Sequence, residues 1–329
     1  MSKLNTYLIL IAMAFVAFAS CKEKGTDPQT KEEWITYTTS NSELASNDVY
    51  CIVADRNNNI WIGTDEGLNK FDGSSWTTYT TSNSELISNV ISSIAIDNNN
   101  IWIGTDEGLN KFDGTNWITY TTSNSGLVNN YGITSIAVDN NHNIWIGTDG
   151  ALNKFDGSNW TNYTTSNSGL IYPSISCIAV DNNNNIWIGQ PADNGGGVSK
   201  FDGTNWTSYT PENSGLIGSW ITSITIDNNY NIWIGTDGGV SKFNGSNWTS
   251  YTTENSGLVN NQIHSLAIDN NNNIWIGTYY DGCKFDGSIW TSYTTENSGL
   301  IYPNISCIAV DKSNNVWIGT SEGISVLKR

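Results

Sequence analysis

The sequence predicts an all-β fold, a single seven-bladed β-propeller with four strands in each blade. The first observation is a pentapeptide, Ile60-Trp61-Ile62-Gly63-Thr64, which recurs with small changes in seven copies. The tryptophans of the copies are Trp61, Trp102, Trp145, Trp187, Trp233, Trp275 and Trp317. Their spacing of 41 to 46 residues is the length of one four-stranded blade. The second observation is that no long stretch has apolar residues at helical spacing, whereas short strand-like runs alternate with Asn, Asp, Gly and Ser turns.

One repeat unit predicts four short strands in order. Residues 90–96 alternate apolar and small residues, and residues 101–105 are almost wholly apolar, as expected for a strand buried on both faces. Residues 109–112 form the predicted third strand, and the Asp-Gly pair after it favours a tight hairpin turn. Residues 117–121 are rich in Thr and aromatic residues, which suits a half-exposed outer strand.

The two ends of the chain predict how the ring closes. Residues 34–38 resemble a fourth strand with no third strand before it, and residues 323–327 resemble a third strand with no fourth strand after it. A second tryptophan series also has seven members, Trp34, Trp76, Trp117, Trp160, Trp206, Trp248 and Trp290. We therefore expect the N-terminal strand to complete the last blade of a domain spanning residues 33–329. Such closure removes the free strand edges of an open array.

The asparagine runs between the first and second strands of each unit have two interpretations. Asn tolerates left-handed backbone geometry, so an Asp followed by several Asn residues favours a tight turn. The alternative is a calcium loop, because Asp55, Asn57 and Asn59 stand at alternate positions. The glycine and the glutamate that complete an EF-hand loop are missing, which favours the turn.

The N-terminus predicts export and anchoring rather than folded structure. Residues 1–20 contain Lys3 and then a short apolar stretch, the pattern of a signal peptide. The residues before Cys21 resemble the lipobox of bacterial lipoproteins, which implies that Cys21 is lipid-modified; an ordinary secretory signal is the alternative. Residues 21–32 are polar and charged, as in a linker. An Asp directly after the cysteine would resemble an inner-membrane retention signal, but residue 22 is Lys. By this resemblance, the expected location is the outer membrane of a bacterial envelope.

Charge and cysteine content exclude several classes of partner. The formal net charge of −17 disfavours nucleic acid and anionic lipid, so the only membrane contact expected is the lipid anchor. Cys51, Cys177 and Cys307 share a repeat position with Ser in the other four copies, which indicates a small side chain rather than a disulfide. Cys283 stands alone, and no CxxC motif or Cys/His cluster exists. We expect neither a metal site nor a cofactor.

The repeat resembles the two-component regulator propeller family. Residues 181–189, 150–155 and 167–170 carry its Asp…Asn-x-Trp-x-Gly, Gly-Leu and Asn-Ser-Gly-Leu elements. The family's turn glycine is replaced, for example by Asn58, His142 or Tyr230. Many relatives are periplasmic inputs of hybrid histidine kinases. This sequence carries neither the membrane span nor the kinase that follow in them, so the resemblance does not imply phosphotransfer.

Candidate ligand-binding residues stand where the copies differ. The turn after the second strand expands in copy four to residues 190–197 and becomes Tyr279-Tyr280-Asp281 in copy six. Trp220 and Gln262 precede first strands, and Tyr172 and Tyr302 stand shortly before two others. In the propeller fold these loops share one rim with the channel mouth, where we expect aromatic platforms for sugar rings; packing on neighbouring loops is the alternative. The candidates are Tyr172, Trp220, Gln262, His264, Tyr279, Tyr280, Asp281 and Tyr302.

Catalysis has little support in the sequence. The chain has two histidines, and no nucleophile, base and orienting group can be assembled around His264. The acidic turns, such as Asp65-Glu66 and Asp106-Glu107, either collect a divalent cation or are simply solvated. We expect a monomeric, non-catalytic module that binds a glycan, a peptide or another envelope protein. The alternatives are an accessory sensor of a two-component system and a propeller lyase or hydrolase with a site near His264.

Overall fold

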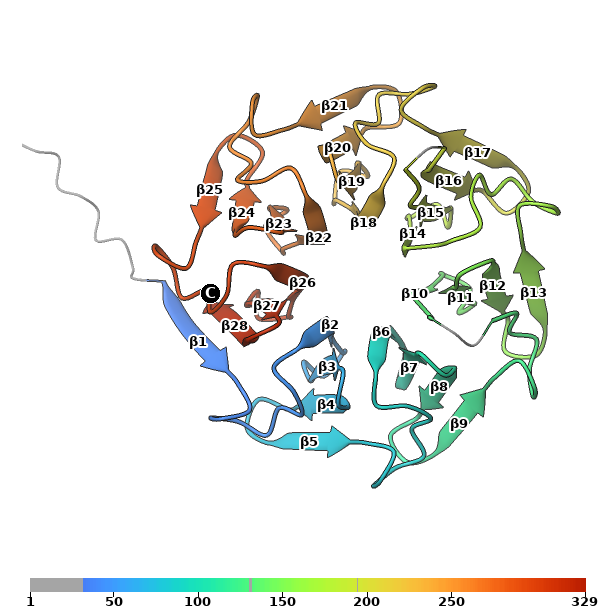
Figure 1. Cartoon of the computed structure of the whole chain (residues 1–329), viewed down its shortest axis with the longest axis vertical. Coiled ribbons are helices and arrows are strands. Elements are labelled where there is room, and N and C mark those ends of the chain that lie inside the picture. The colour runs from blue at the N-terminus through green and yellow to red at the C-terminus, as the bar shows by residue number, and fades with distance from the viewer. Residues whose placement is uncertain (1–31, 130–131, 194) are drawn as a thin grey trace, which may run out of the picture. The chain divides into compact units, whose positions relative to one another are not determined.

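The computed structural model describes residues 32–129, 132–193 and 195–329. The predicted signal peptide, Cys21 and nearly all of the predicted linker lie outside these residues. The described part of the chain contains 28 strands, arranged in seven four-stranded antiparallel sheets around one axis (Figure 1). The predicted seven-bladed propeller is confirmed. Within these residues no helix is long and apolar enough to cross a bilayer.

Each blade runs outward from the axis, and in six of the seven blades the strands follow chain order (Figure 1). The innermost strands are β2 (Val49–Ala54), β6 (Ile91–Asp97), β10 (Ser135–Val138), β14 (Cys177–Val180), β18 (Ile221–Ile226), β22 (Ile263–Ile268) and β26 (Ile305–Val310). The second strands are β3 (Ile60–Thr64), β7 (Asn100–Thr105), β11 (Ile144–Gly147), β15 (Ile186–Gln190), β19 (Ile232–Thr236), β23 (Ile274–Thr278) and β27 (Val316–Thr320).

The two outer positions complete the blades. The third strands are β4 (Leu68–Phe71), β8 (Leu109–Phe112), β12 (Leu152–Phe155), β16 (Gly197–Phe201), β20 (Gly239–Phe243), β24 (Gly282–Phe285) and β28 (Gly323–Lys328). The outermost strands are β5 (Trp76–Tyr79), β9 (Trp117–Tyr120), β13 (Trp160–Tyr163), β17 (Trp206–Tyr209), β21 (Trp248–Tyr251), β25 (Trp290–Tyr293) and β1 (Glu33–Tyr37). Blades 1 to 6 begin at β2, β6, β10, β14, β18 and β22, and blade 7 consists of β26, β27, β28 and β1.

The hydrophobic core lies between blades, which explains the recurring pentapeptide. All five residues of β3 are buried, and Trp61 packs against Ile91 and Phe112 of blade 2. Gly63 is required by this close approach, because a Cβ atom there would lie 2.6 Å from the Ile91 side chain. Each blade therefore buries its apolar surface against the next one, and a single blade has no complete core of its own.

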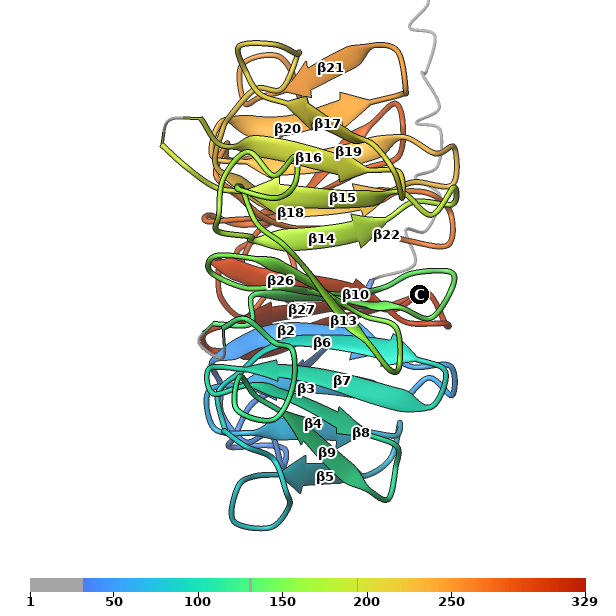
Figure 2. The ribbon, with the colours of Figure 1, turned by 90° about the vertical axis from the view of Figure 1, so that its right-hand side faces the viewer.

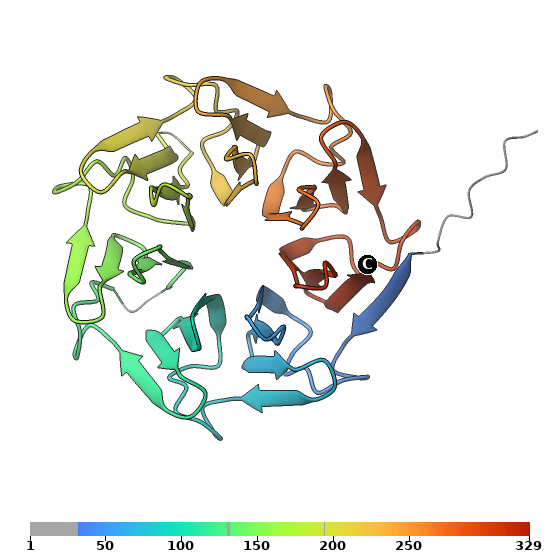
Figure 3. The same cartoon turned by 180° about the vertical axis from the view of Figure 1, so that it is seen from behind.

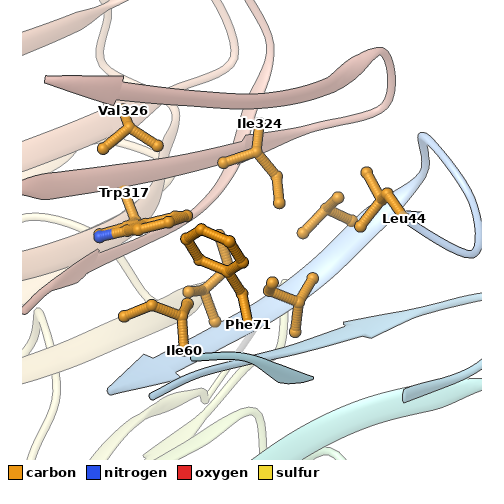
Figure 4. Packing of buried hydrophobic residues seen from close by; sticks show 9 residues of the cluster. Leu44, Ile60, Phe71, Trp317, Ile324 and Val326 are labelled. Atoms are coloured by element: carbon orange, nitrogen blue, oxygen red, sulfur yellow. The ribbon is translucent and has the colours of Figure 1, made fainter. Parts of the chain in front are cut away.

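The N-terminal strand closes the ring, as predicted. β1 pairs with β28 in antiparallel register, with Trp34 opposite Leu327. Tyr37 of β1 stacks on Trp317 at 5.9 Å. Blades 7 and 1 then pack through Leu44, Ile60, Phe71, Trp317, Ile324 and Val326 (Figure 4). The first and last parts of the chain thus share one sheet and one apolar cluster.

The turn between the first and second strands is built on one carboxylate. In blade 3, Asp139 Oδ1 accepts the backbone N–H groups of Asn141 at 2.8 Å and Asn143 at 2.9 Å. Asp139 Oδ2 accepts Asn143 Nδ2 at 2.7 Å and Trp145 Nε1 at 3.0 Å. We call this arrangement the Asp clasp; it recurs at Asp55, Asp181, Asp227, Asp269 and Asp311. Four N–H donors surround each carboxylate, so the turn interpretation is confirmed and the calcium alternative is wrong.

Antiparallel pairing gives the ring two rims. The upper rim carries the turns between second and third strands and the crossovers that lead into each innermost strand. The lower rim carries the Asp clasps and the turns between third and fourth strands. The strands run between the two rims in the edge-on view of Figure 2, and Figures 1 and 3 show the ring from its two faces. The rims differ in both aromatic and charged residues.

Candidate functional site on the upper rim

Exposed aromatic side chains gather on the upper rim. Each belongs to a crossover, to a turn after a second strand, or to the start of an innermost strand. They are Tyr50, Tyr172, Trp220, Tyr279, Tyr280 and Tyr302. Among the described residues, the lower rim has one comparable side chain, Tyr230. Five of the six upper aromatic residues were predicted as candidates, and the structure places all five on this rim.

Blade 6 and its boundary with blade 7 bring most of the predicted residues together. The rings of Tyr279 and Tyr280 meet edge to face at 4.7 Å, and the His264 ring meets Tyr279 at 5.9 Å. The Tyr279 backbone N–H donates to the Gln262 carbonyl at 3.0 Å, which joins the turn to the crossover of the same blade. These contacts form a continuous aromatic surface in which Tyr280 is the most exposed member.

Asp281 ends this turn in a strained backbone conformation. Its φ of 66° lies in the left-handed region, at the position that Gly67 and Gly108 occupy in blades 1 and 2. Its N–H donates to the Pro303 carbonyl at 2.7 Å, next to Tyr302 of blade 7. Burial raises the pKa of the Asp281 carboxyl, and Oδ1 is buried without a hydrogen-bond partner. Such strain concentrates at functional sites, and it distinguishes this turn from its six counterparts.

Trp220 and Tyr172 belong to a second group at blades 4 and 5. The expanded turn of blade 4 approaches blade 5 so closely that a Cβ on Gly196 would lie 2.4 Å from the Ser219 carbonyl oxygen, beside Trp220. Gln190 Nε2 donates to the Tyr172 carbonyl, and Gln190 Oε1 accepts the Ser199 hydroxyl at 2.5 Å. No ring contact joins these two aromatic residues to the Tyr279 group within the described chain. The predicted candidates therefore form two groups rather than one.

Tyr50 is a rim residue that the sequence analysis missed. It is the second residue of its innermost strand, where five blades carry a hydroxyl that donates to a backbone carbonyl. These residues are Ser92, Thr134, Ser176, Thr222 and Ser306. Blades 1 and 6 carry Tyr50 and His264 instead. Burial is the main cause that raises the pKa of Tyr50, and the negative charges of Asp48 and Asp65 raise this pKa further. Comparing the seven copies at this one position would have identified it.

His264 has a defined hydrogen-bonding state. Its Nδ1 lies 3.2 Å from the Ile305 carbonyl oxygen, which can only accept, so Nδ1 is the donor in this contact and Nε2 is left for other partners. On the next blade, Ser306 Oγ lies 2.5 Å from the Val49 carbonyl oxygen and 2.9 Å from the Gly319 carbonyl oxygen, so its one proton is directed to these backbone acceptors. This hydroxyl is therefore held by carbonyl groups and is not activated by His264. The geometry suits a polar contact to a ligand better than nucleophilic chemistry.

Acidic residues occur on both rims, but all the described Lys and Arg residues lie towards the lower rim. Among the described residues, the upper-rim turns and crossovers carry only acidic charged groups. They are Glu43, Asp48, Asp65, Glu66, Glu85, Asp106, Glu107, Asp149, Asp193, Glu212, Asp237, Glu254, Asp281, Glu296 and Glu322. The Lys and Arg residues of the propeller lie in clasp turns or towards the lower ends of third strands. They are Arg56, Lys70, Lys111, Lys154, Lys200, Lys242, Lys284, Lys312, Lys328 and Arg329. No three described His, Cys, Asp or Glu side chains could hold a metal ion together.

The four described cysteines are free thiols in packed positions. Burial raises the pKa of Cys177, Cys283 and Cys307 to about 12, so these thiols stay protonated near neutral pH and are poor nucleophiles. At the position shared with Cys51, serine has a further role. Ser93 Oγ accepts the Ile136 N–H of the next blade at 3.0 Å. The position therefore favours a small side chain, and in the serine copies it also links blades.

The repeats identify the family. A family model described as two component regulator propeller matches residues 43–66, 85–107, 126–150, 169–190, 215–238, 257–280 and 299–322. These matches together span just over half of the chain. The chain belongs to this family. Each match in the regulator propeller runs from a crossover through the first two strands of a blade, so it includes most of the upper rim.

Solved structures share the fold of this regulator propeller. The extracellular domain of the hybrid two component system BT3049 from B. thetaiotaomicron is similar with a TM-score of 0.75 and 24% identity, over 90% of this chain and 42% of that one. PorZ, a surface component of the type-IX secretion system of Porphyromonas gingivalis, gives 0.69 and 18%, over 86% and 46%. A streptogramin B lyase gives 0.73 and 14%, over 90% and 97%. No curated protein matched the sequence.

The lengths of these relatives limit what the comparisons carry over. The regulator propeller spans about two fifths of the first matched two component extracellular domains. At these identities the likeness concerns the fold alone, for sensor domains and lyases alike.

Proposed function

We propose that this regulator propeller is a non-catalytic, extracytoplasmic binding module whose upper rim binds an uncharged glycan. The observation that carries the proposal is that six exposed aromatic residues lie on a rim whose described turns and crossovers contain no Lys or Arg. Aromatic faces offer apolar area at a small loss of side-chain freedom, and nearby polar groups can then orient a ligand. Sugar rings present apolar C–H faces to such platforms and hydroxyl groups to Asp and Asn side chains.

Charge selects among the possible glycans. Carboxylates stand in most of the upper-rim turns, so an anionic ligand would meet repulsion and no compensating cation. A neutral oligosaccharide avoids this repulsion. Gln262, His264, Tyr279 and Tyr280 are the expected contacts at blade 6, where His264 Nε2 would form a hydrogen bond with a sugar hydroxyl. Trp220 and Tyr172 are the expected contacts at blades 4 and 5.

The test is calorimetric titration of the full chain with neutral and acidic oligosaccharides of equal length. Tyr280→Ala and Trp220→Ala should each weaken binding of the neutral ligand at least tenfold. Ile289→Ala is the matched control, because Ile289 is at least as exposed as Tyr280 and Trp220 but lies in a lower-rim turn. If the acidic series binds as tightly as the neutral one, or if the control weakens binding as much as the rim variants, the proposal is wrong.

The proposed location is the outer membrane of a bacterial envelope, with lipid attached at Cys21 after removal of residues 1–20. The lipobox-like sequence supports this assignment. The remaining residues 21–32 would be the linker to a monomeric propeller that contacts neither nucleic acid nor the bilayer. Labelling cells with a fatty-acid analogue should mark the wild-type chain and not Cys21→Ser.

A second candidate function is input to a two-component system. Family membership supports it, because the family is named for such regulators. Under this proposal, the rim with its ligand bound would contact a separate membrane kinase. Deleting the protein should then change the kinase-dependent response to the bound glycan. An unaltered response would leave binding alone as the function. A hydrolase that used Ser306 as its nucleophile is disfavoured, because the Ser306 hydroxyl is bound by backbone carbonyl groups. A lyase near His264 is the remaining catalytic alternative, and turnover that is lost in His264→Ala would establish it.

A further inference from the structure

The lower rim contains pockets of one design at the junctions between blades. Each lies between an Asp clasp with its tryptophan, a lysine of the same blade, and the two lower turns of the next blade. The junction of blades 4 and 5 has a pocket of about 280 Å³, lined by Lys200, Tyr230 and Asn244 among others. The corresponding pockets at blades 1–2 and 5–6 measure about 260 and 210 Å³. In the pocket between blades 4 and 5, two residues differ from those at the same positions of most other blades.

The first departure is Tyr230. At this position of the clasp turn, four other blades carry an Asn whose Oδ1 accepts a backbone N–H of the preceding blade. The bonds run from Asn140 to Asn184, from Asn228 to Asn272, from Asn270 to Asn314 and from Lys312 to Asn58, at 2.7 to 2.8 Å. The donor at the 4–5 junction would be the Asn182 N–H, and Tyr230 offers no amide oxygen to receive it. A hydrogen-bond acceptor has been removed here.

The second departure is Asn244. In each pocket, the lysine of one blade lies across from the third-to-fourth strand turn of the next blade. This turn carries Asp113 in the pocket of Lys70 and Asp286 in the pocket of Lys242. Opposite Lys200 this carboxylate is replaced by the amide of Asn244. The remaining acid in the pocket, Asp181, has its carboxylate occupied by the backbone N–H groups of Asn183 and Asn185 and by the Asn185 and Trp187 side chains.

Tyr230 removes an amide oxygen from the pocket, and Asn244 removes a carboxylate. The N–H donors of Asn182 and Lys200 remain without these hydrogen-bond acceptors. The Lys200 ammonium group is positioned over the Trp187 ring, with its nitrogen 5.2 Å from the centroid. Tyr230 adds an aromatic ring that is 63% exposed, in a left-handed conformation with φ of 64° that is unusual for a bulky side chain. An oxyanion on a ring-shaped ligand satisfies all of these groups at once. The volume suits one sugar unit rather than an oligosaccharide.

We propose that the pocket between blades 4 and 5 binds an anionic sugar, a uronic acid unit in the first instance. Its carboxylate accepts from Lys200 Nζ and the Asn182 N–H, and its ring lies against Tyr230. The Asn244 amide donates to a ring hydroxyl or to the carboxylate. This site lies on the rim opposite the proposed glycan site and has the opposite charge preference, so the two proposals stand or fall separately.

The experiment is titration of the full chain with glucuronate, with glucose and with inorganic sulfate, followed by NMR or calorimetry. Glucuronate should bind at least tenfold more tightly than either of the others. Equal binding of glucose overturns the role of the anion, and equal binding of sulfate overturns the role of the ring. Tyr230→Asn and Asn244→Asp restore the repeat residue, so both should fold, and each should weaken glucuronate binding at least tenfold.

Matched variants at the next junction separate this site from a general surface effect. Lys200→Met should abolish glucuronate binding, whereas Lys242→Met, in the same position of blade 5, should leave it unchanged. The double variant Asn272→Tyr with Asp286→Asn transfers both departures to the 5–6 junction and should create a second glucuronate site there. Loss of binding in Lys242→Met, or one site only in the double variant, would contradict the proposal.

Discussion

Replacing Asp139 by Asn tests whether the Asp clasp stabilises each blade. The amide can still accept the backbone N–H groups of Asn141 and Asn143 through its oxygen. Its NH2 group then faces two donors, Trp145 Nε1 and Asn143 Nδ2, which Asp139 Oδ2 accepts at 3.0 and 2.7 Å. Two buried donors lose their acceptor, at about 1–3 kcal/mol each, and the remaining bonds lose the charge of the carboxylate. We expect Asp139→Asn to lower the free energy of unfolding by about 3–5 kcal/mol.

The melting temperature is the most direct measure of this loss. A propeller of about 300 residues has an unfolding entropy of roughly 0.6 kcal/mol per degree, so Tm should fall by about 5–8 °C. Blade 2 supplies a matched control. Its clasp turn is one residue shorter, Trp102 Nε1 is already without a partner, and Asp97 instead contacts the exposed His142 ring at 2.7 Å.

The control separates a specific hydrogen-bond effect from a general effect of removing an acid. The His142 side chain is 58% exposed although Asp97 is only 13% exposed, so solvent screens this pair and it contributes at most about 1 kcal/mol. Asp97→Asn should therefore lower Tm by less than about 2 °C. Both variants are followed by differential scanning calorimetry at pH 7. If Asp97→Asn lowers Tm as much as Asp139→Asn does, the clasp does not stabilise the blades in the way argued here.

Three further predictions concern stability. Deleting residues 33–37 should lower Tm by more than 10 °C and expose the β28 edge to self-association, which light scattering would detect; an unchanged melting curve would contradict ring closure by β1. Hydrogen bonds outweigh burial and lower the pKa of four clasp carboxyl groups, Asp55, Asp139, Asp227 and Asp269. The stability that these ionised carboxyl groups contribute is fully present above the ordinary Asp pKa of about 4 and is lost as pH falls through their lowered pKa values. Tm should therefore be constant above about pH 5 and fall steeply below about pH 4. A Tm that stays flat down to about pH 3 would refute this. Tyr230→Asn should raise Tm by about 2 °C, since it relieves the left-handed Tyr and restores the bond from Asn182; a lower Tm would mean that Tyr230 stabilises the junction.

The repeated part of the fold was predictable because each local pattern has one physical solution. The apolar pentapeptide fits only a strand buried on both sides, and Gly63 marks the contact between blades. Trp34 without a preceding strand indicated that β1 belongs to the last blade. Identical units must pack in the same way, so seven tryptophans and a spacing were sufficient to predict the ring.

The candidate site was predictable only in part, for two reasons. Loop residues such as Trp220 and Tyr280 interrupt the repetition visibly, and this placed them on the correct rim. Their grouping depends on which turn meets which crossover, and that follows from distances between blades rather than from spacing in the sequence. Tyr50 was missed because it is the second residue of a regular strand, where an aromatic residue looks unremarkable unless the seven copies are compared.

The departures from repetition have one physical meaning on both rims. In blade 6, Asp281 replaces a glycine at positive φ and leaves a buried oxygen without a partner. In blade 5, Tyr230 replaces an asparagine at positive φ, and a bond between blades disappears. Each change places at positive φ a side chain that tolerates this conformation less well than the Gly or Asn of most other blades, so we expect it to lower the stability of its turn. The regular blades supply enough stability to support both irregular turns. Because these turns break the local pattern without a gain in stability, they are where we expect ligand binding.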